Sequence, residues 1–120
     1  MLEGDAGLVR ERLLADERRI VEEIESLDER AREEQSPGET AGEQLADDAA
    51  LTVEREKDQA HRRGLQAALS DIRSALTKLE RGDYGRCDSC GEPINPQRLR
   101  ALPQASLCIK CKAKSERGRF

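Results

Sequence analysis

The 120-residue sequence contains very few aromatic side chains: one Tyr, one Phe and no Trp. Charged residues make up 38% of it, so the chain can bury only a small hydrophobic core. It has no apolar run of about 20 residues, which argues against a membrane span. Residues 1–30 lack the apolar region of a secretory signal peptide. We therefore expect a small cytoplasmic protein that needs a bound metal for stability.

The sequence also lacks the motifs that common enzymes require. It contains no phosphate-binding loop, no Ser/His/Asp set and no paired carboxylates with a partner base. The single histidine, His61, lies in a polar stretch that is typical of a solvated helix residue. These absences predict a protein that is not an enzyme.

The net charge of −4 is unevenly distributed along the chain. Residues 82–120 contain eight Lys/Arg and four Asp/Glu, a net charge of +4, so residues 1–81 carry −8. A duplex-DNA-binding protein needs a strongly basic face. We therefore expect no sequence-specific DNA binding, and a partner that presents a basic protein surface.

All the cysteines lie near the C-terminus, as two C-x2-C pairs with 17 residues between them. This spacing is typical of a four-cysteine zinc site, because Zn²⁺ prefers four soft ligands in a tetrahedron. Disulfides and unrelated free thiols are the alternatives, and a thioredoxin-type redox pair would need a βαβ context. Four thiolates leave no open position for water, so we expect one structural zinc ion. The predicted ligands are Cys87, Cys90, Cys108 and Cys111, and Gly91 suits a tight turn with positive φ.

Two long helix-favouring segments precede the cysteines, at residues 7–34 and about 43–81. Helix-breaking residues between them (Pro37, Gly38 and Gly42) predict a short turn and an antiparallel arrangement. The fold class that we predict is mainly α, a long antiparallel helical hairpin (coiled coil) followed by a small C-terminal four-cysteine zinc finger. The apolar seam of the first helix has coiled-coil spacing at Leu13, Ile20, Ile24, Leu27 and Ala31.

We predict four segments: a frayed N-terminus (1–6), the hairpin (7–81, with its tip near 35–49), the zinc finger (82–115) and a tail (116–120). A generic dimerisation coil is the alternative for the hairpin. The apolar seam of the second helix is weak near the acidic turn, which favours a probe that enters a charged site. We therefore expect a monomer.

The cysteine region resembles the C-terminal zinc finger of the DksA/TraR family, bacterial regulators that bind RNA polymerase. The similarity rests on the 17-residue gap, on Gly82-Asp-Tyr-Gly-Arg-Cys87 and on Arg98-Leu99-Arg-Ala101-Leu-Pro103. With the preceding hairpin, it covers about residues 8–115. The resemblance implies that the hairpin tip enters the secondary channel of the polymerase and modulates initiation, while the finger stays at the rim.

The resemblance also implies the residues of the tip. The family motif Asp-x-x-Asp-x-Ala aligns with residues 44–49, where Asp47 and Ala49 match and Gln44 replaces the first Asp. Gln44 keeps a hydrogen-bond acceptor but lacks the charge. The alternative is a solvated helix start, where acids favour the helix dipole. The polymerase-contacting tip implied by the family comprises Glu43, Gln44, Asp47, Asp48 and Ala49.

Family members that respond to guanosine tetraphosphate use basic residues at positions that align with Asp71, Leu102 and Lys112. Only Lys112 is basic, and a highly charged anion beside Asp71 is unfavourable, so we expect no such binding. Two other functions stay open. A Gre-like elongation and transcript-cleavage factor would share the hairpin but lack this finger. A nucleic-acid-binding zinc ribbon would need stacking residues, and the finger offers only Tyr84.

Overall fold

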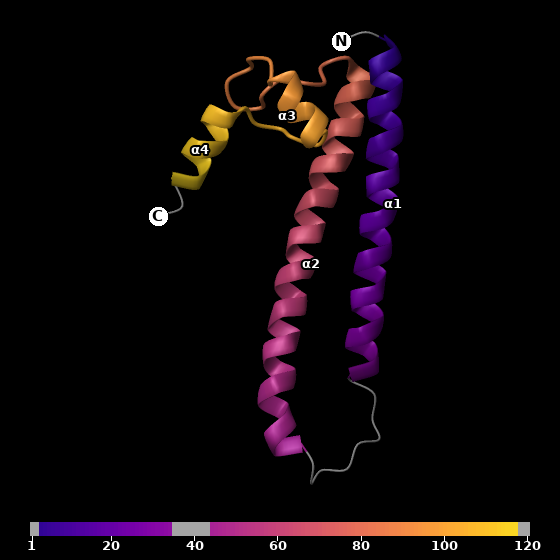
Figure 1. The fold of residues 1–120 in the computed structure, drawn as a ribbon, viewed down its shortest axis with the longest axis vertical. Helices are drawn as coiled ribbons and strands as arrows, with labels where there is room; N and C mark the ends of the chain where they lie inside the picture. The colour runs from indigo at the N-terminus through magenta and orange to yellow at the C-terminus, as the bar shows by residue number, and fades with distance from the viewer. Residues whose placement is uncertain (1–2, 35–43, 118–120) are drawn as a thin grey trace.

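The computed structural model describes residues 3–34 and 44–117. It contains α1 (Glu3–Glu34), α2 (Gln44–Arg81), α3 (Pro96–Ala101) and α4 (Ile109–Arg117). Helices α1 and α2 run antiparallel as a long hairpin, and the chain after α2 folds back beside one end of it (Figure 1). Across the described residues, the only β-type pairing is one isolated bridge between Arg86 and Pro93. The predicted mainly α fold is confirmed.

The helix ends differ in detail from the predicted ones. Helix α1 begins at Glu3, so most of the segment 1–6 that we predicted to be frayed is helical. The absence of proline from this stretch allows the helix to continue toward the N-terminus. Helix α4 ends at Arg117 and therefore takes in the first two residues of the predicted tail, 116–120. Within the described part of the chain, none of the helices has the length and apolar character needed to cross a membrane.

The hydrophobic core is a seam between α1 and α2 at the finger end of the hairpin. Leu13 is fully buried, and it forms one cluster with Ile20, Ile72 and Ala75, each at most 6% exposed. Leu27, seven residues after Ile20, is also 6% exposed. The predicted spacing of seven residues in α1 is thus confirmed. Partly buried residues packed against the cluster are Val9, Ile24, Leu65, Ala68, Leu69, Leu76, Leu79 and Tyr84.

Apolar packing weakens away from the finger. Ala31, which we predicted to lie in the seam, is exposed, and Val53 on α2 is 49% exposed. The prediction for Ala31 is wrong, because polar pairs replace apolar contacts here: Arg62 Nε donates to Asp28 Oδ1 at 2.8 Å. The exposure of Val53 agrees with the weak seam that the sequence predicts for the second helix near the turn. Ion pairs that stay this accessible to water contribute only about 0–1 kcal/mol each. Other ion pairs across the hairpin join Arg30 to Asp58 and Arg73 to Glu17, and His61 Nε2 lies 3.8 Å from a carboxylate oxygen of Glu23.

Candidate metal centre

The first cysteine pair lies on a tight turn after α2. Gly91 has a φ of 77°, the positive value that the sequence predicts for this position. The N–H of Gly91 donates to the carbonyl oxygen of Cys87 at 3.0 Å, and the N–H of Cys87 donates to that of Glu92 at 2.9 Å. These two hydrogen bonds close the chain around the first pair of thiols.

The second cysteine pair lies at the beginning of α4. Cys108 directly precedes the helix, and Cys111 belongs to its first turn. A spacing of three residues places both side chains on one helix face. The N–H of Asp88 donates to the carbonyl oxygen of Ser106 at 2.8 Å, so the two cysteine-bearing segments lie side by side.

The four sulfur atoms form one compact cluster. They all lie within 4.8 Å of one another, and Cys90 Sγ is 3.9 Å from Cys108 Sγ. All four cysteines are free of disulfide bonds. A tetrahedral zinc ion with Zn–S bonds of ~2.3 Å requires sulfur–sulfur separations of about 3.8 Å. The cluster therefore has the donor type, number and spacing of a closed tetrahedral zinc site.

The thiols influence one another's ionisation. Hydrogen bonds from the backbone N–H groups of Cys108 and Cys90 lower the pKa of Cys87 to about 6. The backbone N–H of Cys111 likewise lowers the pKa of Cys108. In contrast, the side chains of Cys108 and Cys87 raise the pKa of Cys111 to about 12. Thiolates this close repel one another, so ionisation of all four requires a cation between them.

Side chains outside the cysteine pairs anchor the two segments. On α2, Lys78 Nζ lies 2.6 Å from Oδ1 of Asp88, inside the first C-x2-C pair. On α3, Arg98 Nε donates to the carbonyl oxygen of Leu107, just before the second pair, at 3.2 Å. Each pair is thus held by a neighbouring residue as well as by its own turn.

One further contact closes the finger on itself, and another places it against α1. The hydroxyl of Tyr84 donates to the carbonyl oxygen of Pro103 at 2.8 Å. The guanidinium of Arg12 donates to the carbonyl oxygens of Arg100 and Ala101, at the end of α3. Sequence reasoning missed Arg12, because its partners lie 88 and 89 residues away and no local pattern signals such a contact.

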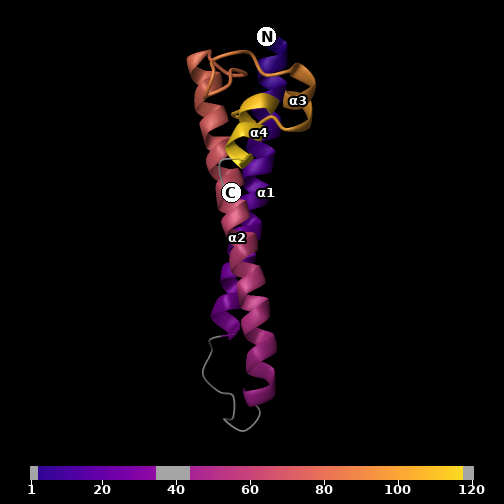
Figure 2. The same ribbon diagram turned by 90° about the vertical axis from the view of Figure 1, so that its left-hand side faces the viewer.

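The start of α2, which holds four of the five predicted tip residues, lies at the end of the hairpin opposite α3 and α4 of the finger (Figures 1 and 2). Gln44, Asp47, Asp48 and Ala49 belong to the first two turns of α2. Their side chains, and Glu43 as a whole, lie outside the described residues. The 38 residues of α2 separate the two ends by about 57 Å at 1.5 Å per residue. The two predicted sites are therefore far apart.

A helical hairpin with a four-cysteine zinc finger at its base is the class of protein that this fold and site define. Residues 82–117 match the family model described as the prokaryotic dksA/traR C4-type zinc finger. The chain belongs to the DksA/TraR family, and its finger carries one structural zinc ion.

Named relatives support this assignment over different parts of the chain. The RNA polymerase-binding transcription factor DksA of Haemophilus influenzae is 48% identical over 48 residues, 40% of this chain and 33% of that protein. The Escherichia coli factor of the same name is 46% identical over 48 residues, 40% of this chain and 32% of that protein. These sequence matches span about a third of each relative. The solved structure of transcription factor DksA2 from Pseudomonas aeruginosa matches 98% of this chain and 88% of its own, with a TM-score of 0.77 and 32% identity.

Proposed function

We propose that this chain is a transcription regulator that binds RNA polymerase and modulates initiation by placing its hairpin tip in the secondary channel. The curated relatives are named as RNA polymerase-binding transcription factors. The observation that carries the proposal is the structural match to DksA2 over 98% of this chain, because it includes the hairpin as well as the finger. A match to the finger alone would support only a zinc-binding module.

In this proposal the finger is a structural base. Cys87, Cys90, Cys108 and Cys111 are the ligands of the zinc ion, and the metal supplies folding free energy to a segment with little core of its own. Contacts from Lys78 and Arg12 to the finger keep it at a fixed orientation to both long helices. The finger rests at the rim of the channel, and the polymerase itself carries out all the chemistry.

The shape and charge of the hairpin suit this role. The molecule measures 63 × 34 × 20 Å, and most of its length is a rod of two helices. Residues 1–81 carry a net charge of −8, and Glu43, Asp47 and Asp48 lie at the end that would enter the channel. An acidic tip can contact basic groups or bound metal ions near a polymerase catalytic centre. The chain acts as a monomer in the cytoplasm.

Asp47→Asn tests the tip. Loss of the carboxylate charge removes one charge-assisted contact, which is worth about a factor of ten. We expect polymerase binding to persist while the effect on the lifetime of open promoter complexes falls about tenfold. Asp71→Asn, an exposed acid in the same helix, is the matched control and should behave like the parent protein. Asp47→Asn could instead change the lifetime of open promoter complexes as much as the parent protein does, while replacement of the cysteines abolishes the effect. That result would remove the tip from the mechanism.

Two assays separate this proposal from the alternatives. A Gre-like factor would stimulate transcript cleavage in backtracked complexes, whereas a regulator of initiation would leave the cleavage rate unchanged. A nucleic-acid-binding zinc ribbon would show salt-dependent affinity for DNA, whereas this chain should show none.

The proposal includes no binding of guanosine tetraphosphate at the junction of helix and finger. Asp71, Leu102 and Lys112 are all exposed, and only Lys112 carries a positive charge. An alarmone-dependent gain in polymerase regulation that disappears with Lys112→Ala would contradict this part.

A further inference from the structure

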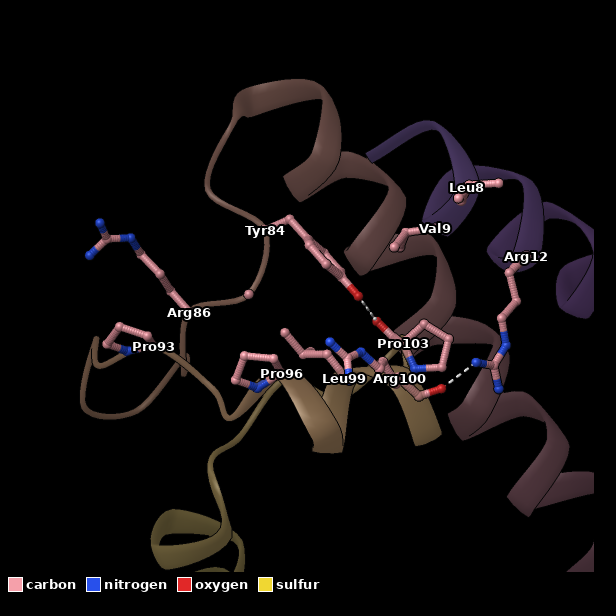
Figure 3. Close-up of a pocket in the computed structure, with 11 residues that line it drawn as sticks. Leu8, Val9, Arg12, Tyr84, Arg86, Pro93, Pro96, Leu99, Arg100 and Pro103 are labelled. Atoms are coloured by element: carbon pink, nitrogen blue, oxygen red, sulfur yellow. Dashed lines mark hydrogen bonds between the residues drawn. The ribbon is translucent and has the colours of Figure 1, made fainter. Parts of the chain in front are cut away.

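A cavity of about 640 Å³ lies between α1 and the zinc finger. Leu8 and Val9 on α1 form one side, Tyr84 after α2 forms a second, and Pro96 and Leu99 of α3 face them (Figure 3). Sites for small molecules in proteins commonly have volumes of about 300–1,000 Å³ and mainly apolar walls. The cavity therefore has the size and lining of a ligand site, and it is distinct from the cysteine cluster.

The walls of this cavity are already formed in the protein. Three of the four prolines in the sequence line it: Pro93, Pro96 and Pro103. Each proline ring fixes its own backbone φ. The hydroxyl of Tyr84 donates to the carbonyl oxygen of Pro103 at 2.8 Å, which holds the aromatic ring in place. A ligand would not have to order these walls, and such preorganisation favours binding.

The charged side chains at the cavity are all arginines. Arg12, Arg86 and Arg100 line it, and the lining includes no Asp or Glu. Arg12 donates to two carbonyl oxygens of the finger. Within the described part of the chain, the guanidinium groups of Arg86 and Arg100 have no hydrogen-bond or ion-pair partner. A guanidinium donates two parallel hydrogen bonds to a carboxylate.

We propose that this cavity binds a small ligand with an apolar body and one carboxylate head group, of the class of medium-chain carboxylates. The apolar body lies against Leu8 and Leu99, and the head group pairs with Arg100, because the guanidinium of Arg86 points away from the other lining side chains (Figure 3). Leu8 is 67% exposed, so a ligand here would shield a large apolar side chain from water. The site is at the finger end of the molecule, and the proposal does not depend on polymerase binding.

The test uses the full-length, zinc-loaded chain and decanoate as the probe. Isothermal titration should give one decanoate per chain, and amide shift changes in NMR spectra should centre on Leu8, Gly85 and Leu99. Decanol, which has the same chain length but no charge, should bind at least about tenfold more weakly, because it cannot accept a charge-assisted hydrogen bond pair. Equal affinity for decanol, or no saturable binding of decanoate, would overturn the proposal.

Substitutions locate the site. Arg100→Ala should weaken decanoate binding by up to about tenfold, and Arg86→Ala should have a smaller effect. Arg63→Ala removes an exposed arginine of α2 outside the cavity and should leave the affinity unchanged. Leu8→Glu adds a negative charge at an exposed helix position without lowering helix propensity, so the fold persists and binding should be lost. Retained binding in Leu8→Glu, or equal losses in all three arginine variants, would show non-specific adsorption.

Discussion

At the scale of single residues, the zinc finger depends on a few side chains that each make one decisive contact. The backbone N–H groups of the two cysteine turns stabilise the thiolate of Cys87, which lowers its pKa to about 6. Cys87 is also the most enclosed of the four cysteines, at 3% exposure. It is therefore the ligand whose loss should disturb the finger most.

Cys87→Ser should reduce the zinc content of the purified protein to well below one ion per chain. Serine has nearly the same size, but its hydroxyl stays protonated and is a poor zinc ligand. Metal analysis by mass spectrometry measures the effect, and competition with a chromogenic chelator should show a loss of affinity of at least about tenfold. Ser89→Ala lies in the same turn, outside the ligand set, and should keep a full zinc ion. A full zinc ion in Cys87→Ser would exclude this residue as a ligand.

Gly64 lowers the stability of α2, and no contact in the structure explains why a glycine is present there. It lies inside α2, and a Cβ added there would meet no atom within 4 Å. Close packing against a neighbouring helix is therefore not the reason for a glycine at this position. Glycine in a helix interior costs about 1 kcal/mol relative to alanine.

Gly64→Ala should therefore raise the free energy of unfolding by about 1 kcal/mol. Urea denaturation followed by circular dichroism measures this change. Ala60→Gly, four residues earlier on the same exposed helix surface, is the reverse control and should lower the stability by a similar amount. A destabilised Gly64→Ala would mean that the glycine has a structural role that the hairpin alone does not reveal.

At the scale of elements, the long helices and the short ones depend on different forces. Helices α3 and α4 have 6 and 9 residues, and helices this short are unstable in isolation. Their residues include none that are buried. The hairpin has its own seam around Leu13 and Ile72. The finger should therefore require metal, and the hairpin should not.

Removal of zinc with a strong chelator should unfold the finger and leave the hairpin helical. Helices α3 and α4 contribute 15 of the 85 helical residues that the structure describes, so the helical circular dichroism signal should fall by about a sixth. Addition of zinc should restore the lost signal. Collapse of the whole helical signal on chelation would show that the seam depends on the finger.

The elements were largely predictable from the sequence, because their signals are local. Heptad spacing located Leu13, Ile20 and Leu27, and the breaker residues predicted the end of α1 at Glu34 and the start of α2 at Gln44 to within about a residue. Cysteine spacing and Gly91 predicted a cluster that the structure brings together. The contacts of Arg12 and Lys78 were not predictable, because they join residues that meet only after the finger folds onto the hairpin. The distal seam was predicted wrongly at Ala31, because heptad spacing does not reveal where polar pairs replace apolar packing.

At the scale of the whole molecule, the finger contacts both helices of the hairpin. Lys78 links it to α2, and Arg12 links it to α1. Two attachments on different helices restrict rotation of the finger about the rod. The position of the tip relative to the finger, about 57 Å along α2, is therefore defined by the fold. A protein with a fixed base and a fixed reach can place its tip at one depth in a channel.

The most direct test of this account is site-specific photo-crosslinking to RNA polymerase from the tip. A photoreactive amino acid at position 48 of the full-length, zinc-loaded chain should crosslink to polymerase segments that line the secondary channel near the catalytic centre. The same amino acid at position 110, in the finger, should crosslink to the outer rim. Crosslinks from position 48 only to the outer surface, or none while the complex stays intact, would contradict the proposed insertion of the hairpin.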